Sequence, residues 1–112
     1  GLMSFFSGVE HSGFFSFIGA FSPAFLCYTN DDWRNYLLNK MTDNMPYLYI
    51  YSGNGDELEQ VIFEGTEMMY DLLPETGYPY DMMNEVILFE NEHNEKAWRE
   101  IFPDFLHTFL CK

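Results

Sequence analysis

Two residues of this 112-residue sequence, Asp56 and His93, have the side chains and the positions that acid–base chemistry needs. Asp56 follows the turn-forming residues 52–55 (Ser-Gly-Asn-Gly), and His93 lies a few residues after a later apolar segment. A carboxylate that accepts the Nδ1–H of a histidine fixes the ring tautomer and leaves Nε2 free to take a proton from a nucleophile. The pair therefore indicates the acid and the base of a catalytic triad. The alternative is a surface aspartate in a turn and a histidine near a helix N-terminus, because a chain with 18 acidic residues and three histidines can produce this spacing by chance.

Strands that alternate with helices are expected to position Asp56 and His93. Apolar runs predict three strands, over residues 14–21, 47–51 and 85–89. The helical spacing of apolar residues predicts four helices, over residues 1–10, 31–40, 57–73 and from residue 94 onward. This order predicts one α/β domain over residues 1–112, with three parallel strands and flanking helices. Because sites form where parallel strands end, the loops that carry Asp56 and His93 are expected to lie side by side.

Several segments carry specific expectations about packing. Residues 14–21 show little polar alternation, which is typical of a strand buried on both faces of a sheet. Asp31 and Asp32 are expected to cap the second helix. That helix is expected to turn three side chains inward, Trp33, Leu37 and Leu38. The third helix is expected to bury an apolar stripe of core residues, Leu58, Val61, Ile62, Gly65, Met68, Met69 and Leu72. Pro103 lacks an N–H group and is expected to bend or restart the last helix.

The composition excludes several classes of function. Hydrophobic residues make up 47% of the chain and aromatic residues 20%, which is typical of a globular domain with a substantial core. The net charge of −13 repels phosphate, so neither nucleic acid nor an anionic membrane is expected as a partner. No apolar run reaches the roughly 18–20 residues that span a bilayer, and no signal peptide is visible.

No metal ion and no organic cofactor is expected. The three histidines, at positions 11, 93 and 107, lack the close spacing of a zinc site such as HExxH. His11 and His107 are therefore expected to be surface or partly buried structural residues. Cys27 and Cys111 are too far apart for a CxxC motif, and two free core thiols are favoured over one long-range disulfide.

Four blocks of the sequence resemble the C-terminal half of one family of enzymes. In one-letter code they read GLMSFF at residues 1–6, GAFSPAF at 19–25, YIYSGNGD at 49–56, and HNEKAWRE with FPDFL at 93–106. In this order they resemble the helix after a nucleophile elbow, the next strand with its Ser-Pro loop, the acid-bearing strand, and the histidine block of the esterase D-like α/β-hydrolases. That family includes enterobactin-esterase-like and feruloyl-esterase-like members. The His-Asn-Glu-x-x-Trp segment is the most specific of the blocks.

The resemblance implies a role for each matching residue. His93 is the triad histidine and Asp56 the triad acid, with Glu57 as a second candidate for the acid. The family's serine lies in a G-x-S-x-G elbow, which the register puts about three residues before Gly1, outside this chain together with the oxyanion N–H groups. The resemblance thus implies a serine carboxylesterase that cleaves a small-molecule ester without metal or cofactor. The 112 residues would be the last three strands of its eight-stranded sheet, cut from something longer and inactive alone.

The sequence also departs from the family pattern and leaves alternatives open. Residues 89–92 (Phe-Glu-Asn-Glu) carry glutamates and an asparagine where many relatives have glycines, and Asp56 stands where many have glutamate. A non-catalytic acidic interaction module, a pseudoenzyme without a serine, and an acyltransferase or peptidase of the same fold are the other readings. The first strand would lack its usual neighbour, so the isolated chain is expected to self-associate through an open strand edge.

Overall fold

A parallel three-stranded sheet lies at the centre of the computed structural model, which describes residues 1–88 and 90–111. The strands follow one another in the order of the sequence, β1 (Phe17–Phe21), β2 (Tyr47–Gly53) and β3 (Met83–Leu88). Both pairings are parallel, with Phe17 opposite Tyr47 and Leu48 opposite Met83. The predicted α/β class with three parallel strands and flanking helices is therefore confirmed.

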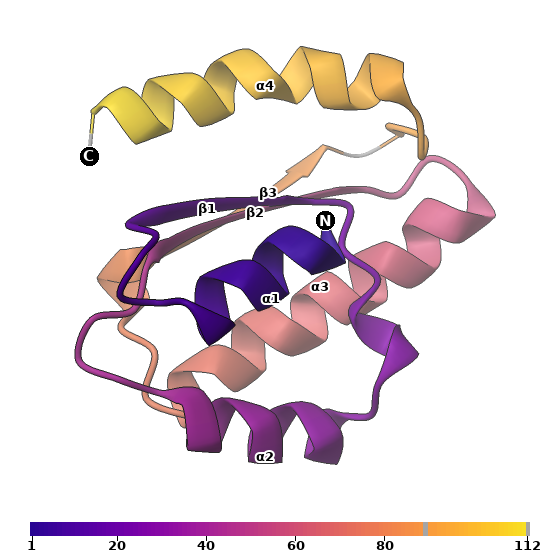
Figure 1. Cartoon of the computed structure of the whole chain (residues 1–112). Helices are drawn as coiled ribbons and strands as arrows, with labels where there is room; N and C mark the ends of the chain where they lie inside the picture. Colours follow the sequence, from indigo (N-terminus) through magenta and orange to yellow (C-terminus); the bar gives the residue numbers. More distant parts are fainter. Residues whose placement is uncertain (89, 112) are drawn as a thin grey trace.

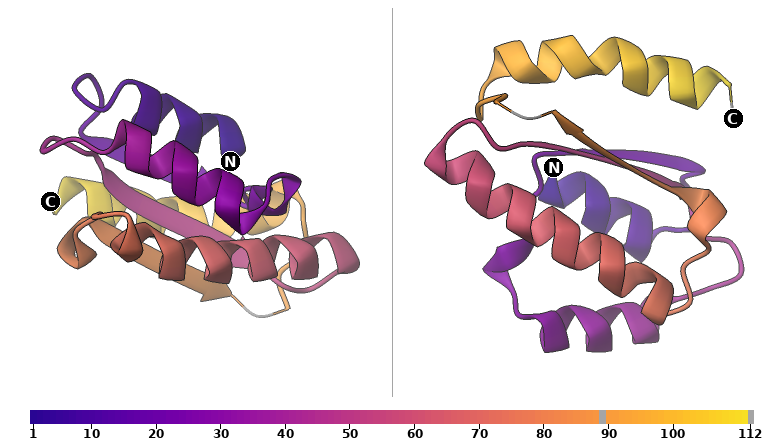
Figure 2. Two further views of the ribbon diagram at one scale, coloured as in Figure 1. Left: turned by 90° about the horizontal axis from the view of Figure 1, so that it is seen from below. Right: turned by 180° about the vertical axis from the view of Figure 1, so that it is seen from behind.

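The helices lie in layers on the two faces of this sheet (Figure 1). They are α1 (Leu2–Glu10), α2 (Asn30–Lys40), α3 (Glu57–Glu75) and α4 (Glu95–Leu110), with short 3-10 helices at Phe25–Cys27 and Tyr80–Met82. α1 and α3 cover one face and α2 lies beneath them, whereas α4 lies on the other face, as the views from below and from behind also show (Figure 2).

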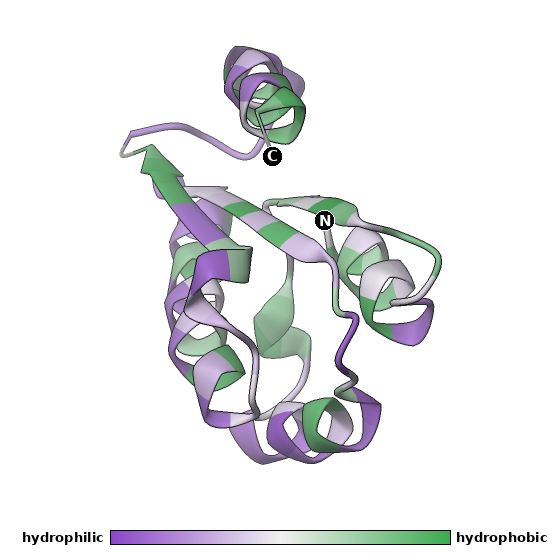
Figure 3. Ribbon diagram, turned by 90° about the vertical axis from the view of Figure 1, so that its left-hand side faces the viewer, coloured by the Kyte–Doolittle hydropathy of each residue, from purple (hydrophilic) through white to green (hydrophobic). Residues whose placement is uncertain are grey.

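The larger part of the core fills the space between the sheet and the three helices α1, α2 and α3. It includes Phe5, Trp33, Leu48, Ile50 and Met69, all at most 2% exposed. A smaller cluster lies between the sheet and α4, where the hydropathy colouring shows α4 standing apart from the other helices (Figure 3). Its fully buried members are two tyrosines of β2 and one residue of α4, namely Tyr49, Tyr51 and Ile101.

The first strand is shorter than predicted. β1 begins at Phe17, and residues 11–14 form a turn in which Phe14 N–H donates to the carbonyl of His11 at 2.8 Å. Phe14 is 83% exposed, so its apolar side chain does not belong to the strand. The third strand starts two positions earlier than predicted, at Met83, and its predicted end at Phe89 lies outside the described residues.

The second helix begins with a capping box that differs from the predicted cap. The N-cap is Thr29, whose hydroxyl accepts from Asp32 N–H at 3.1 Å, while the Asp32 carboxylate accepts from Thr29 N–H at 3.3 Å. Trp33 and Leu37 are buried as predicted, but Leu38 is 55% exposed, so its inward orientation was predicted wrongly. α2 is the outermost helix and buries only a narrow stripe.

Three further predictions differ from the structure. They concern the buried stripe of α3, the effect of Pro103 on α4 and the burial of the two cysteines. Leu58 and Val61 of α3 are about half exposed, whereas the remainder of the predicted stripe is buried or partly buried. α4 runs through Pro103 as one helix, so of the two predicted effects the restart is wrong and the bend stays a prediction. Two cysteines are free as predicted, but both are exposed on the surface, namely Cys27 and Cys111. In the described part of the chain, no helix combines the length and apolarity that membrane crossing requires.

The edge strand β1 supports a prediction about association. β1 pairs only with β2 among the described strands, so its other edge offers unpaired N–H and C=O groups. Such an edge can pair with another chain. We expect the isolated chain to elute from a size-exclusion column at increasing apparent mass as its concentration rises. A single monomer peak over the whole concentration range, together with a sharp thermal transition, would contradict this expectation.

Candidate active site

Asp56 joins the two loops that follow β2 and β3. It is the N-cap of α3, where its Oδ1 accepts from the N–H of Glu59 at 2.7 Å. Its Oδ2 accepts from the main-chain N–H of His93 at 3.0 Å. These two hydrogen bonds to the ionised form, the one from Glu59 first, lower the pKa of Asp56 below its ordinary value. The structure thus brings Asp56 and His93 together, but through the backbone of His93 and not through its ring.

The ring of His93 has a different carboxylate as its partner. Its Nδ1 lies 2.8 Å from Oε1 of Glu59, a residue in the first turn of α3 whose side chain is fully buried. The other oxygen of Glu59, Oε2, accepts from the N–H of Gly53 at the end of β2 at 2.8 Å. Glu57, the second candidate from the sequence, lies in the same turn and is exposed. The carboxylate that orients the histidine ring is therefore that of Glu59.

Glu59 has a signature in the sequence, because it shares the helical spacing of the buried face of α3. Glu59, Ile62, Thr66 and Met69 share one buried face of α3, at the spacing i, i+3, i+7 and i+10. A glutamate on a buried helix face is rare unless it is paired. An acidic residue at a core position of a predicted helix therefore marks Glu59 as a further candidate for the acid, in addition to Asp56.

The hydrogen bond to Glu59 sets the tautomer of His93. When Glu59 is ionised and the ring of His93 is neutral, the carboxylate can only accept, so Nδ1 carries the proton and Nε2 keeps a free lone pair. The side chain of Glu59 is 0% exposed and that of His93 is 30% exposed, so the acid is shielded from solvent while the histidine ring is accessible to it. The arrangement suits a base that takes a proton at Nε2 while Nδ1 stays bound to the buried acid.

A cavity of about 360 Å³ opens beside His93. It is lined by residues from three separate segments, namely Gly1, Leu2, Phe21, Ser22, Ala24, His93 and Trp98. Gly1 is the N-cap of α1, and no side chain of the described residues caps this helix, so its first N–H groups have no side-chain partner there. These groups and the positive end of the helix dipole favour negative charge at this end of α1.

Ser22 and Trp98 form the wall of the cavity next to the histidine. The indole Nε1 of Trp98 donates to Oγ of Ser22 at 3.0 Å, and the ring of Trp98 meets that of His93 edge-on with centroids 5.1 Å apart. Ser22 has φ of 50°, in the left-handed region that non-glycine residues seldom occupy. Its N–H donates to the carbonyl of Tyr51 at 2.8 Å. Backbone strain of this kind concentrates at functional sites, which fits the position of Ser22 in this cavity wall.

Two glycines allow the loop before α3 to pack directly on the loop before α4. A Cβ atom on Gly53 would lie 2.3 Å from the carbonyl oxygen of Asn91, and one on Gly55 would lie 2.2 Å from that of Glu90. Gly55 N–H also donates to the carbonyl of Asn91 at 2.7 Å. Larger residues at either position would push the loops apart, and with them Glu59 and His93.

Comparison with known proteins finds no matching family model, no matching curated protein and no matching solved structure. The other two histidines, His11 and His107, are exposed and do not line the cavity beside His93.

The lowered pKa of Asp56 leads to a prediction about acid stability. Because its folded-state pKa lies below the unfolded value, Asp56 stabilises the fold fully above the unfolded pKa of about 3.9, and this contribution is lost as the pH falls through the lower folded-state value. We expect Asp56→Asn to lose less stability than the wild type between about pH 5 and pH 2. Asparagine is an equally good N-cap, so α3 should still form.

Urea unfolding at a series of pH values measures this difference. Asp43→Asn is the matched control, since Asp43 is exposed and makes no hydrogen bond or ion pair among the described residues. An acid profile of Asp56→Asn identical to that of the wild type would show that the two hydrogen bonds do not depend on the charge of Asp56.

Proposed function

We propose that this chain is the C-terminal half of a serine ester hydrolase of the α/β-hydrolase fold, for which it supplies the histidine and the acid of the triad. The observation that carries the proposal is the pair of His93 and buried Glu59. Nδ1 of His93 contacts Glu59, and the same ring lines the cavity at the start of α1. The parallel sheet supports it, since such enzymes place their sites at the carboxyl ends of the strands.

In this proposal the nucleophile comes from the residues that precede Gly1 in a longer protein. The family's serine sits on a strained turn between a strand and a helix, and α1 would be that helix. Gly1 and His93 line the same cavity, so a serine hydroxyl just before Gly1 could reach Nε2 of His93. The unpaired N–H groups at the start of α1 would then help to hold an oxyanion.

The reaction would proceed in two steps. The serine oxygen attacks the ester carbonyl carbon while Nε2 of His93 takes the hydroxyl proton, and Glu59 stabilises the imidazolium through Nδ1–H. The C–O bond to the alcohol breaks as His93 returns the proton to the leaving oxygen. Water then attacks the acyl-enzyme with the same proton exchange and releases the carboxylic acid.

Asp56 takes a different role from the acid that the sequence predicted. Its carboxylate holds the main-chain N–H of His93 and caps α3, so it fixes the distance between the helix that carries Glu59 and the loop that carries His93. We therefore assign Asp56 as a positioning residue and Glu59 as the acid that hydrogen-bonds the ring.

Assays of a longer protein test the proposal. The encoded protein with roughly 120–150 further residues before Gly1, which completes a domain of ordinary size, is assayed on p-nitrophenyl acetate beside the 112-residue chain. We expect turnover only in the longer protein, labelling of one serine just before Gly1 by a fluorophosphonate, and loss of nearly all turnover in His93→Ala. If neither protein hydrolyses the ester and no serine is labelled, the proposal is wrong, and the result favours a non-catalytic interaction module or a pseudoenzyme.

A further inference from the structure

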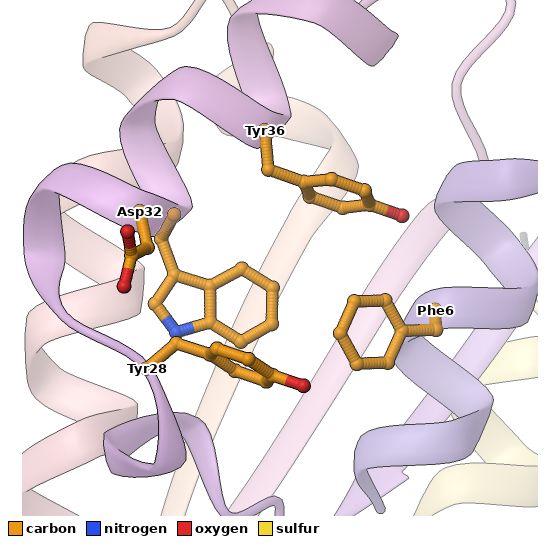
Figure 4. Close-up of a pocket in the computed structure, with 5 residues that line it drawn as sticks. Phe6, Tyr28, Asp32 and Tyr36 are labelled. Atoms are coloured by element: carbon orange, nitrogen blue, oxygen red, sulfur yellow. The ribbon is translucent and has the colours of Figure 1, made fainter.

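A second cavity, of about 240 Å³, lies between α1 and α2 on the side of the molecule away from α4 (Figures 1 and 4). It shares no lining residue with the cavity beside His93. Four aromatic rings and one carboxylate surround it, namely Phe6, Tyr28, Trp33, Tyr36 and Asp32. We refer to these five residues as the aromatic cage.

The four rings of the aromatic cage pack against one another and together line the hollow. Phe6 and Trp33 are stacked, with centroids 5.3 Å apart and planes at 29°. Tyr28 stands across this pair at 88° to Phe6 and 82° to Trp33. Tyr36 stands across it in the same way, at 80° and 74°. Figure 4 shows the rings of Tyr28 and Tyr36 on opposite sides, with the ring of Phe6 beside the space between them.

Hydrogen bonds hold two of these rings in place before any ligand arrives. The indole Nε1 of Trp33 donates to the carbonyl of Phe25 at 2.7 Å, and the hydroxyl of Tyr36 donates to Oε1 of Glu10 at 2.6 Å. A phenol that donates to a carboxylate carries a more electron-rich ring. Rings that are fixed in advance lose little conformational entropy when a ligand binds against them.

The electrostatic surroundings of the aromatic cage favour a cation. Asp32 lines the cavity, and one of its oxygens accepts from Thr29 N–H while the other has no hydrogen-bond partner among the described residues. The whole chain has a net charge of −13. Lys40 does not line the cavity, and its ammonium pairs with Glu10 at 3.0 Å and lies 6.0 Å from the centroid of the Tyr36 ring. A ring of the cage thus already attracts one ammonium from outside.

We propose that the aromatic cage binds a small quaternary ammonium cation of the choline type. Ring faces attract such a cation through their quadrupoles, and the methyl groups of a quaternary ammonium hold water weakly and fill an apolar hollow. The cavity is smaller than the roughly 300–1,000 Å³ of sites for drug-sized ligands, which suits a compact headgroup. A phosphocholine headgroup fits less well, because its phosphate would meet the carboxylate of Asp32. The proposal does not depend on the ester hydrolase.

Calorimetric titration of the 112-residue chain with choline and with 3,3-dimethylbutan-1-ol tests this proposal. The alcohol has the same shape as choline and no charge. We expect choline to bind at least about tenfold more tightly than the alcohol, because only the cation interacts with ring quadrupoles and with Asp32. Phosphocholine is expected to bind more weakly than choline. Equal affinity for choline and the alcohol, or no saturable binding of choline, would overturn the proposal.

Three variants separate the cage from a general effect of charge. Asp32→Asn keeps an oxygen for the bond from Thr29 N–H and is expected to weaken choline binding about threefold to tenfold, with no effect on the alcohol. Asp31→Asn changes the net charge equally at a residue that does not line the cavity, and is expected to leave the affinity unchanged. Tyr28→Leu replaces a half-exposed ring with an apolar side chain and is expected to weaken choline binding about tenfold.

Each outcome with the variants bears on the proposal. Equal weakening by Asp31→Asn and Asp32→Asn would show a diffuse charge effect and overturn the proposal, as would unchanged affinity in Tyr28→Leu. A peptide containing trimethyllysine is titrated as well, and if it binds much more tightly than choline, the assignment to a small cation is wrong. Circular dichroism confirms that each variant is folded before titration.

Discussion

Glu59→Gln is expected to lower kcat for ester hydrolysis in the longer protein by about 10³–10⁴-fold while the fold stays intact. The amide oxygen of glutamine can replace the carboxylate oxygen that accepts from Gly53 N–H, which leaves the amide NH₂ group facing Nδ1 of His93. Nδ1 must then accept, so the proton moves to Nε2 and the ring can no longer act as a base. Hydrolysis of p-nitrophenyl acetate measures the loss.

Two matched variants decide which carboxylate is the acid. Glu57→Gln makes the same chemical change at an exposed residue of the same helical turn and is expected to retain full activity. Asp56→Asn is expected to lose much less activity than Glu59→Gln, since Asp56 bonds only the main chain of His93. A larger loss in Asp56→Asn than in Glu59→Gln would return the role of the acid to Asp56. The ¹⁵N chemical shifts of the His93 ring report the tautomer directly, even in the 112-residue chain.

Trp33→Ala is expected to lower the free energy of unfolding by about 3–5 kcal/mol, a large part of the stability of a small domain. Trp33 is 2% exposed, and its ring centroid lies 5.6 Å from that of Phe5 and 5.7 Å from that of Phe25. The truncation leaves a void at the junction of α1 and α2. It also removes the indole N–H that bonds the buried carbonyl of Phe25.

Urea unfolding followed by far-UV circular dichroism measures this loss. Leu38→Ala is the control on the same helix, because Leu38 is 55% exposed and its truncation should change the free energy of unfolding by no more than about 0.5 kcal/mol. Losses of similar size in Trp33→Ala and Leu38→Ala would show that α2 is not anchored to the core through Trp33.

The alternation of apolar segments was sufficient to predict the α/β class, because strands and helices leave different periods in the sequence. The apolar run did not predict the start of β1 correctly, because the apolar character of residues 14–16 does not distinguish a strand from an exposed turn. The helical spacing also failed for Leu38, because the width of the buried stripe depends on which elements cover the helix, and α2 is covered on one side only. Both errors concern tertiary contacts that a local pattern does not contain.

The structure places the two candidate residues, Asp56 and His93, together and adds Glu59, which the sequence analysis did not name. The rule that sites lie where parallel strands end led to Asp56 and His93, and the structure places these residues in contact. Asp56 has a short side chain whose oxygens are taken by two main-chain N–H groups. One turn of helix then returns Glu59 to the end of β2, where its longer side chain reaches the ring. The path of α3 over the sheet shows which ring this buried glutamate contacts.

α4 packs on the sheet without a neighbouring helix among the described residues, so its docking controls whether the cavity beside His93 is closed. α4 is the one described helix on its face of the sheet, and it begins just after His93 and carries Trp98 in its first turns. An element packed on one side opens locally at a lower free energy than the central strands, so its amide protons should exchange with solvent before those of β2. Each opening separates Trp98 from Ser22 and removes one wall of the cavity. The fraction of molecules in which α4 is docked on the sheet therefore sets the upper limit on the fraction in which the cavity beside His93 is complete.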